Sequence, residues 1–250
     1  MNKYLKNLNR LEFIVTMDCT GSCKHCSEGE HKKSGIHIDA HRAREAVYTV
    51  FGNYKLMSVM TFGGEPLLYP DTVYAIHQAA SEMNIPKRQL ITNGYFSKDE
   101  KKIAEVAKKL KECGVNDLLL SADSFHQETI PIDVVKLFAK EALKADLPLR
   151  LSPAWLVSRE DENPYNIKSR EIVDEFVRLG VAESFGNIIF PEGNAKKYLS
   201  EYFDKDKLYQ NPYEEDPKDV KSISIEADGT LFGKSIYSEN IMDILEAYEP

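Results

Sequence analysis

Three cysteines lie within eight residues of one another near the start of the chain. Cys19, Cys23 and Cys26 are separated by three residues and then by two. In a tight loop after a strand, this spacing can place three thiolates around one corner of a cuboidal iron–sulfur cluster. Such clusters are normally held by four cysteines, one for each iron, so three ligands leave one iron open to bind another molecule. The spacing therefore predicts a metal centre with a free coordination position.

Two other kinds of site can use cysteines at this spacing. A structural zinc ion would need a fourth ligand, for which His25 and His31 are close enough in sequence. A redox-active Cys-x-x-Cys pair is a weaker alternative, because the third cysteine would have no role. The fourth cysteine, Cys113, comes at the end of an amphipathic stretch and is predicted to be structural.

Three further motifs each follow a short apolar run. They are Gly63-Gly64-Glu65-Pro66, Thr92-Asn93-Gly94 and Ser121-Ala122-Asp123-Ser124. Glycines let the backbone approach a ligand closely, and a carboxylate such as Glu65 can accept hydrogen bonds from an ammonium group. Taken alone, each motif also fits an ordinary turn.

Apolar runs and helical patterns alternate along the chain and predict the elements that position these motifs. Strands are expected over 11–17, 59–62, 88–92, 117–121, 147–156 and 185–190, and helices over 39–51, 71–83, 97–113, 132–145 and 170–179. Strict alternation implies a parallel sheet, because parallel neighbours need a crossover connection. Periodicity leaves an open barrel and a doubly wound sheet equally possible. In both folds the chemistry belongs at the carboxyl ends of the strands, where all these motifs lie.

The character of the sequence changes after residue 192. Residues 193–221 are rich in Tyr, Lys, Asp and Glu, and they are followed by a hairpin pattern over 222–225 and 230–232 and by a short helix over 240–248. We therefore predict two regions, a core over 1–192 and a small C-terminal extension over 193–250.

Composition narrows the classes of partner. The chain has 250 residues, of which 42% are hydrophobic and 29% are charged, and its net charge is −8. An acidic chain without a dense Lys/Arg block disfavours general nucleic-acid binding. No apolar run has the length of a membrane span or a signal peptide, so no membrane contact and a cytoplasmic location are expected.

The cysteine spacing after the first strand, followed in order by the three motifs, resembles the radical S-adenosylmethionine (SAM) superfamily. The resemblance implies a partial (β/α)6 TIM-like barrel with a small C-terminal hairpin and helix. It also implies a [4Fe–4S] cluster on Cys19, Cys23 and Cys26 and SAM as the second cofactor. In this family the reduced cluster cleaves SAM to a 5′-deoxyadenosyl radical that abstracts hydrogen from the substrate. A flavodoxin- or ferredoxin-type electron donor is implied as well.

The resemblance also assigns the remaining cofactor-binding residues, which are Gly63, Gly64, Glu65 and Pro66 near the SAM amino group, Asn93 beneath the cofactor, and Ser121 and Asp123 at its ribose or methionine part. The family commonly has Tyr or Phe before the third cysteine, packing on the adenine. Here His25 takes that place and can still stack.

Two residues after strand ends are assigned by position. His126 follows the fourth strand and faces the predicted cavity, where a histidine can orient substrate or shuttle a proton; fixing its own loop is the alternative role. Arg159, just past the fifth strand, could clamp the SAM carboxylate through a forked contact, or could lie on the surface.

The stretches 225–232 and 239–245 resemble the C-terminal extension of the SPASM/twitch subgroup. In that subgroup the extension carries cysteines for auxiliary clusters, whereas no cysteine follows Cys113 here. The extension is thus expected to keep the scaffold without an auxiliary cluster.

The resemblance favours a peptide substrate, modified by epimerisation, cross-linking or a related change. A radical SAM enzyme for a small molecule such as a sugar, nucleoside or amino acid is the alternative. A non-catalytic metal-binding module is less favoured, because it would have no need of the Gly63–Pro66 motif.

Overall fold

The computed structural model describes residues 2–31 and 33–250. Within these residues, seven parallel strands form one sheet in the order β7-β5-β4-β3-β2-β1-β9. Its strands are β1 (Arg10–Thr16), β2 (Ser58–Gly63), β3 (Lys87–Thr92), β4 (Asp117–Leu120), β5 (Leu149–Leu151), β7 (Ala182–Glu183) and β9 (Ser222–Ile225). The predicted parallel α/β sheet is confirmed.

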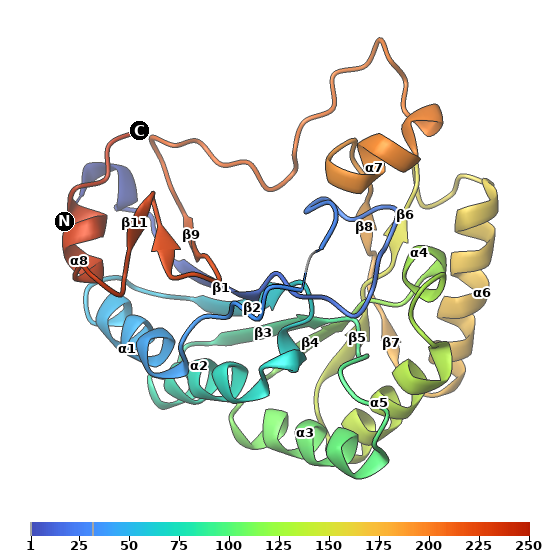
Figure 1. Cartoon of the computed structure of the whole chain (residues 1–250), viewed down its shortest axis with the longest axis horizontal. Helices are drawn as coiled ribbons and strands as arrows, with labels where there is room; N and C mark the ends of the chain where they lie inside the picture. Colours follow the sequence, from blue (N-terminus) through green and yellow to red (C-terminus); the bar gives the residue numbers. More distant parts are fainter. Residues whose placement is uncertain (1, 32) are drawn as a thin grey trace.

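Helices cover the convex face of this curved sheet, and the concave face is left open (Figure 1). The covering helices are α1 (Ala40–Phe51), α2 (Pro70–Glu82), α3 (Glu100–Glu112), α5 (Ile132–Lys144) and α6 (Pro164–Arg178). Short helices η1 (Lys3–Leu5), η2 (Pro66–Leu68), α4 (Ser124–Gln127), α7 (Gly193–Tyr198) and η3 (Ser200–Tyr202) occupy loops. The arrangement is the partial barrel that the motifs imply.

Strand β1 illustrates why the two faces differ. Leu11, Phe13 and Val15 are fully buried and belong to the apolar cores beneath the helices. Arg10 and Glu12 alternate with them and therefore point to the concave side. An alternating strand inside a parallel sheet is unusual, because such strands are normally apolar on both faces. The charged residues on the inner face of β1 therefore indicate an open cavity in place of a packed barrel interior.

The C-terminal extension is joined to the sheet. β9 pairs in parallel with β1, with Arg10 opposite Ser222 and Phe13 opposite Ile225. A hairpin was predicted between 222–225 and 230–232, but the observed hairpin is formed by other strands. In it, β10 (Thr230–Leu231) pairs with β11 (Lys234–Ser235). The closing helix α8 (Ile241–Glu246) packs with α1 in a shared apolar core.

The predicted sixth strand over 185–190 is only partly correct, because β7 of the main sheet lies before this range and β8 (Asn187–Ile188) within it belongs to another sheet. β7 ends at Glu183, and β8 pairs with β6 (Ala154–Trp155) in a separate small sheet. Gly186 causes the break, since its φ is +72° and a Cβ there would lie 2.1 Å from the Pro153 carbonyl oxygen. The chain therefore turns sharply between the two short strands.

Candidate active site

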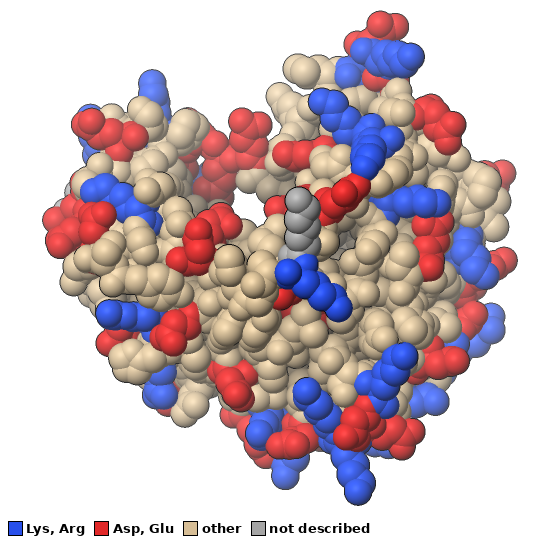
Figure 2. Space-filling view, in the orientation of Figure 1, with Lys and Arg blue, Asp and Glu red and all other residues tan. Residues whose placement is uncertain are grey.

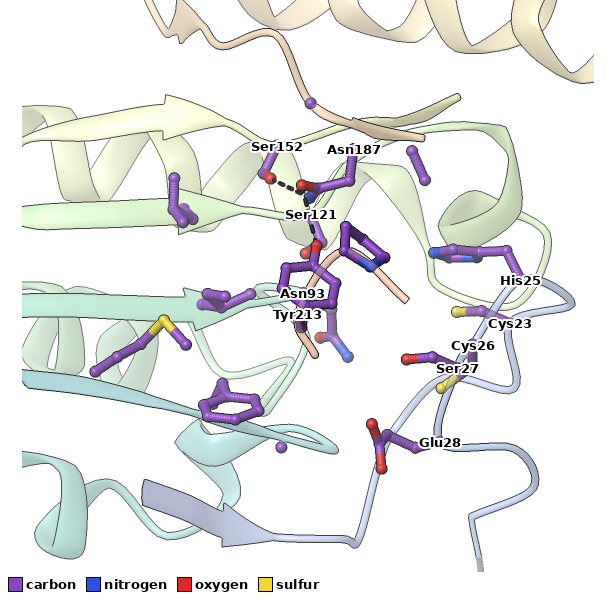
Figure 3. Close-up of a pocket in the computed structure, with 18 of the residues that line it drawn as sticks. Cys23, His25, Cys26, Ser27, Glu28, Asn93, Ser121, Ser152, Asn187 and Tyr213 are labelled. Carbon is purple, nitrogen blue, oxygen red and sulfur yellow. Dashed lines mark hydrogen bonds between the residues drawn. The ribbon is translucent and has the colours of Figure 1, made fainter. Parts of the chain in front are cut away.

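A cavity of about 1250 Å³ occupies the concave side of the sheet. Its walls are the inner faces and carboxyl ends of the strands on one side and the cysteine loop, residues 17–31, on the other (Figure 3). Tyr213 closes part of the mouth, because its hydroxyl donates to Asn187 Oδ1 at 3.2 Å. Asn187 in turn donates to Ser152 Oγ at 3.4 Å.

The three clustered cysteines all line this cavity and are unpaired thiols. Backbone and side-chain N–H groups point at one of them: Gly21 N lies 3.4 Å, and Asn93 Nδ2 3.6 Å, from Cys19 Sγ. Burial raises the pKa of Cys19 to about 11, and it raises the pKa values of Cys23 and Cys26 as well. The metal-free thiols are therefore protonated at neutral pH, and iron would displace their protons on binding.

The ligand atoms favour a cluster over zinc, although His31 Nε2 lies 3.3 Å from Cys26 Sγ. Four ligands around one zinc ion at 2.3 Å lie about 3.8 Å from one another. In the described residues, the group of His, Cys, Asp or Glu ligand atoms that all lie within 4.8 Å of one another is His25, Asp123 and His126, and the three sulfurs form no such group. A cubane fits better, because each thiolate then binds a different iron. The donor set therefore suits a [4Fe–4S] cluster.

The Gly63-Gly64 turn is packed directly against the start of the cysteine loop. Gly64 N donates to Thr16 O, and Glu65 N to Asp18 O, both at 2.8 Å. A Cβ on Gly64 would lie 2.2 Å from the Asp18 carbonyl oxygen, and Gly63 has a φ of +131°. Both glycines line the cavity and present backbone there. Positions 63 and 64 therefore require glycine, because a side chain at either would collide with the backbone at the start of the cysteine loop.

Glu65 and Pro66 lie behind this turn and do not line the cavity. The Glu65 carboxylate is fully buried and accepts from Thr92 Oγ1 at 2.7 Å, Asn93 N at 2.8 Å and Leu67 N at 2.9 Å. Burial raises its pKa to about 7 despite these three bonds. We expected both residues to contact the cofactor, but neither faces the cavity. The Glu65 side chain instead links the end of β2 to the end of β3.

Asn93 and Ser121 line the cavity at the ends of β3 and β4 (Figure 3). Asn93 is fixed on both sides of its amide, since Oδ1 accepts from Tyr95 N at 2.8 Å and Nδ2 donates to Thr20 Oγ1 at 3.2 Å. The amide therefore links the strand end to the cysteine loop.

Asp123 does not reach the cavity, contrary to the expectation that it contacts SAM. It is fully buried, and one oxygen accepts from Phe125 N and His126 N while the other accepts from Ala154 N at 2.8 Å and from the His126 ring. Burial would raise the pKa of Asp123, but the charge and hydrogen bond of His126 hold it far below its usual value. Asp123 is therefore a carboxylate that caps α4 and orients His126.

His126 is placed in the cavity wall by that bond. Its Nδ1 lies 2.8 Å from Asp123 Oδ2, and a carboxylate only accepts, so Nδ1 carries the proton. A neutral His126 then keeps Nε2 as an acceptor. His25 packs edge-on against it, with ring centroids 4.7 Å apart, and tilts against Phe125 at 5.1 Å. Burial lowers the pKa of His25 to about 4, so its ring is uncharged at neutral pH.

Arg159, expected to clamp the SAM carboxylate, is not among the described residues that line the cavity. Its guanidinium forms an ion pair with Glu183 and lies over the rings of Trp155 and Phe185, 5.7 and 5.9 Å from their centroids. It fixes the outside of the short β7–β8 connection.

Sequence reasoning missed the charged and polar residues on the inner face of the strands, which lie there among apolar ones such as Met60 and Ile91. Arg10 pairs with Glu12 at 2.5 Å, and Arg150 binds Asp117 through two N–H groups at 2.8 and 3.0 Å. Gln89 donates to Asp117 Oδ2 at 2.8 Å, which leaves its buried Oε1 without a partner in the part of the chain that the structure describes. The alternation of charged and apolar residues in these strands could have indicated this face.

The Asp117–Arg150 pair is expected to make stability depend on pH. Burial would raise the pKa of Asp117, but Arg150 and Lys87 lower it below its usual value. Such a carboxylate stabilises the fold above its unfolded pKa of about 3.9, and the contribution is lost as the pH falls through the folded pKa. We expect Asp117→Asn to lower the free energy of unfolding by about 1 kcal/mol at pH 7 in urea titrations, and by less below about pH 4.

Glu105→Gln is the control, because Glu105 pairs with Lys109 on an exposed helix face. Its effect should stay below about 0.5 kcal/mol at every pH. A loss at Asp117→Asn that is equally large at pH 7 and pH 3 would contradict the proposed linkage.

With the cavity described, comparison with known proteins decides the family. A family model described as the radical SAM superfamily matches residues 13–145. The chain belongs to the radical SAM superfamily. The predicted cofactors, a [4Fe–4S] cluster and SAM, are those of this superfamily and are confirmed at that level. No helix within residues 2–31 and 33–250 has both the length and the apolar character needed to cross a membrane.

Two solved structures share the radical SAM fold. Native anSMEcpe with bound AdoMet has a TM-score of 0.57 and 18% identity, with 93% of this chain and 76% of that chain covered. BtrN in complex with AdoMet and 2-DOIA has a TM-score of 0.50 and 15% identity, with 95% and 81% covered. These similarities support the partial-barrel architecture.

Two curated relatives match in sequence, and both are described as GTP 3′,8-cyclases. A GTP 3′,8-cyclase from Desulforamulus reducens is 28% identical over 131 residues, which are 52% of this chain. The match spans 38% of that relative's length.

Proposed function

We propose that this radical SAM protein uses SAM to abstract a hydrogen atom from a peptide. The observation that carries the proposal is that the cysteine loop, the Gly63-Gly64 turn, Asn93 and His126 all line one cavity. When bound and reduced, the cluster would supply the electron that cleaves SAM and so generates a 5′-deoxyadenosyl radical. The chain itself binds, orients and shields the reactants.

Each residue then has a defined role. Cys19, Cys23 and Cys26 would ligate the cluster, and the exposed backbone of Gly63 and Gly64 would meet the SAM amino group. Asn93 and Ser121 would contact SAM from the strand ends, and the neutral ring of His25 would pack on its adenine. Glu65, Pro66 and Asp123 would act as supports behind these groups. The flavodoxin- or ferredoxin-type electron donor stays a prediction.

Charge in the cavity favours a peptide over a nucleotide. Seven glutamates line it among the described residues: Glu12, Glu28, Glu183, Glu192, Glu214, Glu215 and Glu226. Arg10 and Arg150 are the arginines of this lining, and both are paired with carboxylates. Figure 2 shows acidic side chains around the hollow. A triphosphate would be repelled there, whereas basic side chains and peptide N–H groups would find carboxylate acceptors.

Size supports the same substrate class. At about 1250 Å³, the cavity exceeds the 300–1,000 Å³ that is typical of small-molecule pockets. SAM and a stretch of peptide could therefore be held together. The structural neighbour anSMEcpe has also been solved with bound AdoMet and a Cp18Cys peptide.

A small-molecule substrate is the second candidate. It is favoured by the sequence match to a GTP 3′,8-cyclase and by the fold that the chain shares with BtrN, which was solved with 2-DOIA. A nucleotide is disfavoured among small molecules, because Arg10 and Arg150 are already paired with carboxylates and are not free to bind its phosphates.

The C-terminal region would belong to a SPASM/twitch-like extension that begins near residue 193. The support for this proposal is that the region contains a short hairpin, β10–β11, and a closing helix, α8, although its first strand, β9, pairs with β1. The absence of any cysteine after Cys113 favours an extension without an auxiliary cluster.

The test is anaerobic reconstitution with iron and sulfide, followed by reduction with SAM and chromatographic measurement of 5′-deoxyadenosine. Two random octapeptide pools, one with a fixed Lys and one with a fixed Glu, are compared with GTP. We expect the Lys pool alone to raise 5′-deoxyadenosine above the substrate-free rate. A response to GTP and to neither pool would overturn the peptide assignment and favour the second candidate.

His126 is expected to serve substrate turnover and to have little part in SAM cleavage. Replacing it with alanine removes the Nε2 acceptor from the cavity wall, and loss of a positioned acid or base costs roughly 10²- to 10⁴-fold in rate. His126→Ala should therefore lower product formation by at least about 10²-fold, as measured by mass spectrometry, while substrate-free 5′-deoxyadenosine formation changes less than about twofold. Glu128→Gln, an exposed neighbour paired with Lys24, should change neither rate. Equal loss of both rates in His126→Ala would assign the residue to the SAM site instead.

A further inference from the structure

The first turn of α7 lies directly on the cysteine loop, although about 170 residues separate the two along the chain. Figure 1 shows α7 beside the loop that follows β1. The contact involves the backbone of Cys23, Cys26 and Ser27 on one side and Gly193 and Asn194 on the other. Two of the three proposed cluster ligands therefore have their main chain held by a segment outside the strand-end motifs.

Gly193 allows the close approach. Its φ is +51°, and a Cβ there would lie 2.2 Å from the Ser27 carbonyl oxygen and 2.6 Å from that of Cys26. Both oxygens belong to the backbone, so no side chain could rotate away to make room. Any larger residue would therefore have to displace the cysteine loop or the start of α7.

Asn194 supplies two hydrogen bonds across the same contact. Its backbone N donates to the Cys26 carbonyl oxygen at 2.8 Å, and its Nδ2 donates to the Cys23 carbonyl oxygen at 3.0 Å. The residue is only 6% exposed, so its amide is held away from competing water. A second contact lies further along the helix, where Lys197 and Tyr198 both bind the Glu30 carboxylate.

The loop needs such outside support because it contains no regular helix or strand. Its own backbone bonds near the cysteines are Cys26 N to Cys23 O at 3.3 Å and Gly29 N to Cys26 O at 3.2 Å. Ordering a residue costs about 1–2 kcal/mol in backbone entropy, which a loop without ladders must recover from neighbouring segments. The carbonyls of Cys23 and Cys26 receive one additional donor each from Asn194.

We infer that Gly193 and Asn194 are positioning residues that set the main chain of Cys23 and Cys26 for cluster binding. The inference rests on the proposed ligand role of these cysteines. The two residues touch neither the sulfurs nor the cavity, and they act through the backbone of the ligand residues. Partners of this kind typically change metal affinity by roughly 10- to 100-fold when they are lost.

The experiment compares Asn194→Asp and Gly193→Ala with two matched controls in the full chain. Asn194→Asp keeps the shape of the side chain but replaces the donor by a carboxylate oxygen facing a carbonyl. Asn166→Asp makes the same change at a fully buried asparagine whose Nδ2 donates to the Leu156, Ser158 and Asp161 carbonyls. Gly233→Ala matches Gly193→Ala, because Gly233 also has a positive φ, +75°, but has nothing within 4 Å of a Cβ.

After anaerobic reconstitution, iron per chain, the rate of iron loss to a chelator and the electron paramagnetic resonance spectrum of the reduced cluster are measured. We expect Asn194→Asp and Gly193→Ala to lose iron roughly 10-fold faster than the wild type and to give a broadened spectrum. Both control variants should unfold at a lower temperature but keep the wild-type rate of iron loss and spectrum. Cys23→Ala is included to report on the ligand assignment itself.

Wild-type iron retention and spectrum in both Asn194→Asp and Gly193→Ala, with loss in Cys23→Ala, would overturn the positioning role alone. Unchanged iron and spectrum in Cys23→Ala would overturn the ligand assignment on which the inference rests. Equally fast iron loss in Asn166→Asp and Asn194→Asp would show a general effect of stability and would also overturn the positioning role.

Discussion

Replacing Cys23 with alanine is expected to abolish 5′-deoxyadenosine formation. Cys23 is the most deeply placed of the three clustered thiols and lines the cavity. With three protein ligands, loss of one leaves two irons without a protein thiolate, so the cluster should neither assemble fully nor bind SAM in a fixed position. We expect activity to fall below the detection limit in the chromatographic assay, together with loss of the visible absorbance of the reconstituted protein.

Cys113→Ala is the matched control. Cys113 is also a buried thiol, but it lies at the end of α3 and donates to the Leu110 carbonyl oxygen at 3.3 Å. Its replacement should cost about 1 kcal/mol of stability and leave 5′-deoxyadenosine formation intact. Retained activity in Cys23→Ala, or loss only in Cys113→Ala, would contradict the ligand assignment.

Replacing Gly64 with alanine is expected to weaken SAM binding by roughly 10- to 100-fold. The added Cβ would lie 2.2 Å from the Asp18 carbonyl oxygen, so the turn and the loop must separate. That movement breaks the bonds from Gly64 N to Thr16 O and from Glu65 N to Asp18 O. The turn backbone proposed to meet SAM would be displaced with them, and each 1.4 kcal/mol of lost binding free energy is tenfold in affinity. Calorimetric titration of the reconstituted protein with SAM measures the change.

Gly52→Ala provides the comparison for this substitution. Gly52 ends α1 with an ordinary helical φ of −63°, and a Cβ there would meet its nearest atoms at 3.4 and 3.6 Å. We expect wild-type SAM affinity and a slight gain in stability. A wild-type dissociation constant in Gly64→Ala would exclude the turn from the SAM site.

The strand-end motifs could be located from the sequence because parallel topology places consecutive strand ends at one edge. The pairing of β9 with β1 could not be predicted, since a local pattern of alternating residues does not specify a partner more than 200 positions away. The nearby Ala227-Asp228-Gly229 turn suggested a hairpin. In the folded chain, β9 pairs with the free edge of β1 instead of forming that hairpin. This edge is apparent only once the whole sheet is known.

The roles of Glu65, Asp123 and Arg159 were beyond sequence reasoning for a different reason. A motif fixes where a residue lies along the chain but not which side of the backbone its side chain occupies. The two carboxylates are turned inward, where backbone N–H groups satisfy their charge. Arg159 does not line the cavity itself and pairs with the carboxylate of Glu183, which does. Buried backbone N–H groups must have hydrogen-bond acceptors in the folded chain. The carboxylates of Glu65 and Asp123 serve as these acceptors and are therefore not directed at the cofactor.

The order in which the sheet is completed has a consequence for synthesis of the chain. β1 precedes the other strands of the sheet along the chain, yet most of its outer edge, residues 10–13, is paired by residues 222–225. Until those residues emerge, the edge of β1 exposes unpaired N–H and C=O groups beside Leu11 and Phe13. An exposed apolar edge of this kind can pair with another nascent chain. Truncation before residue 222 is therefore expected to yield aggregates during expression, even though every proposed cofactor ligand would already be present.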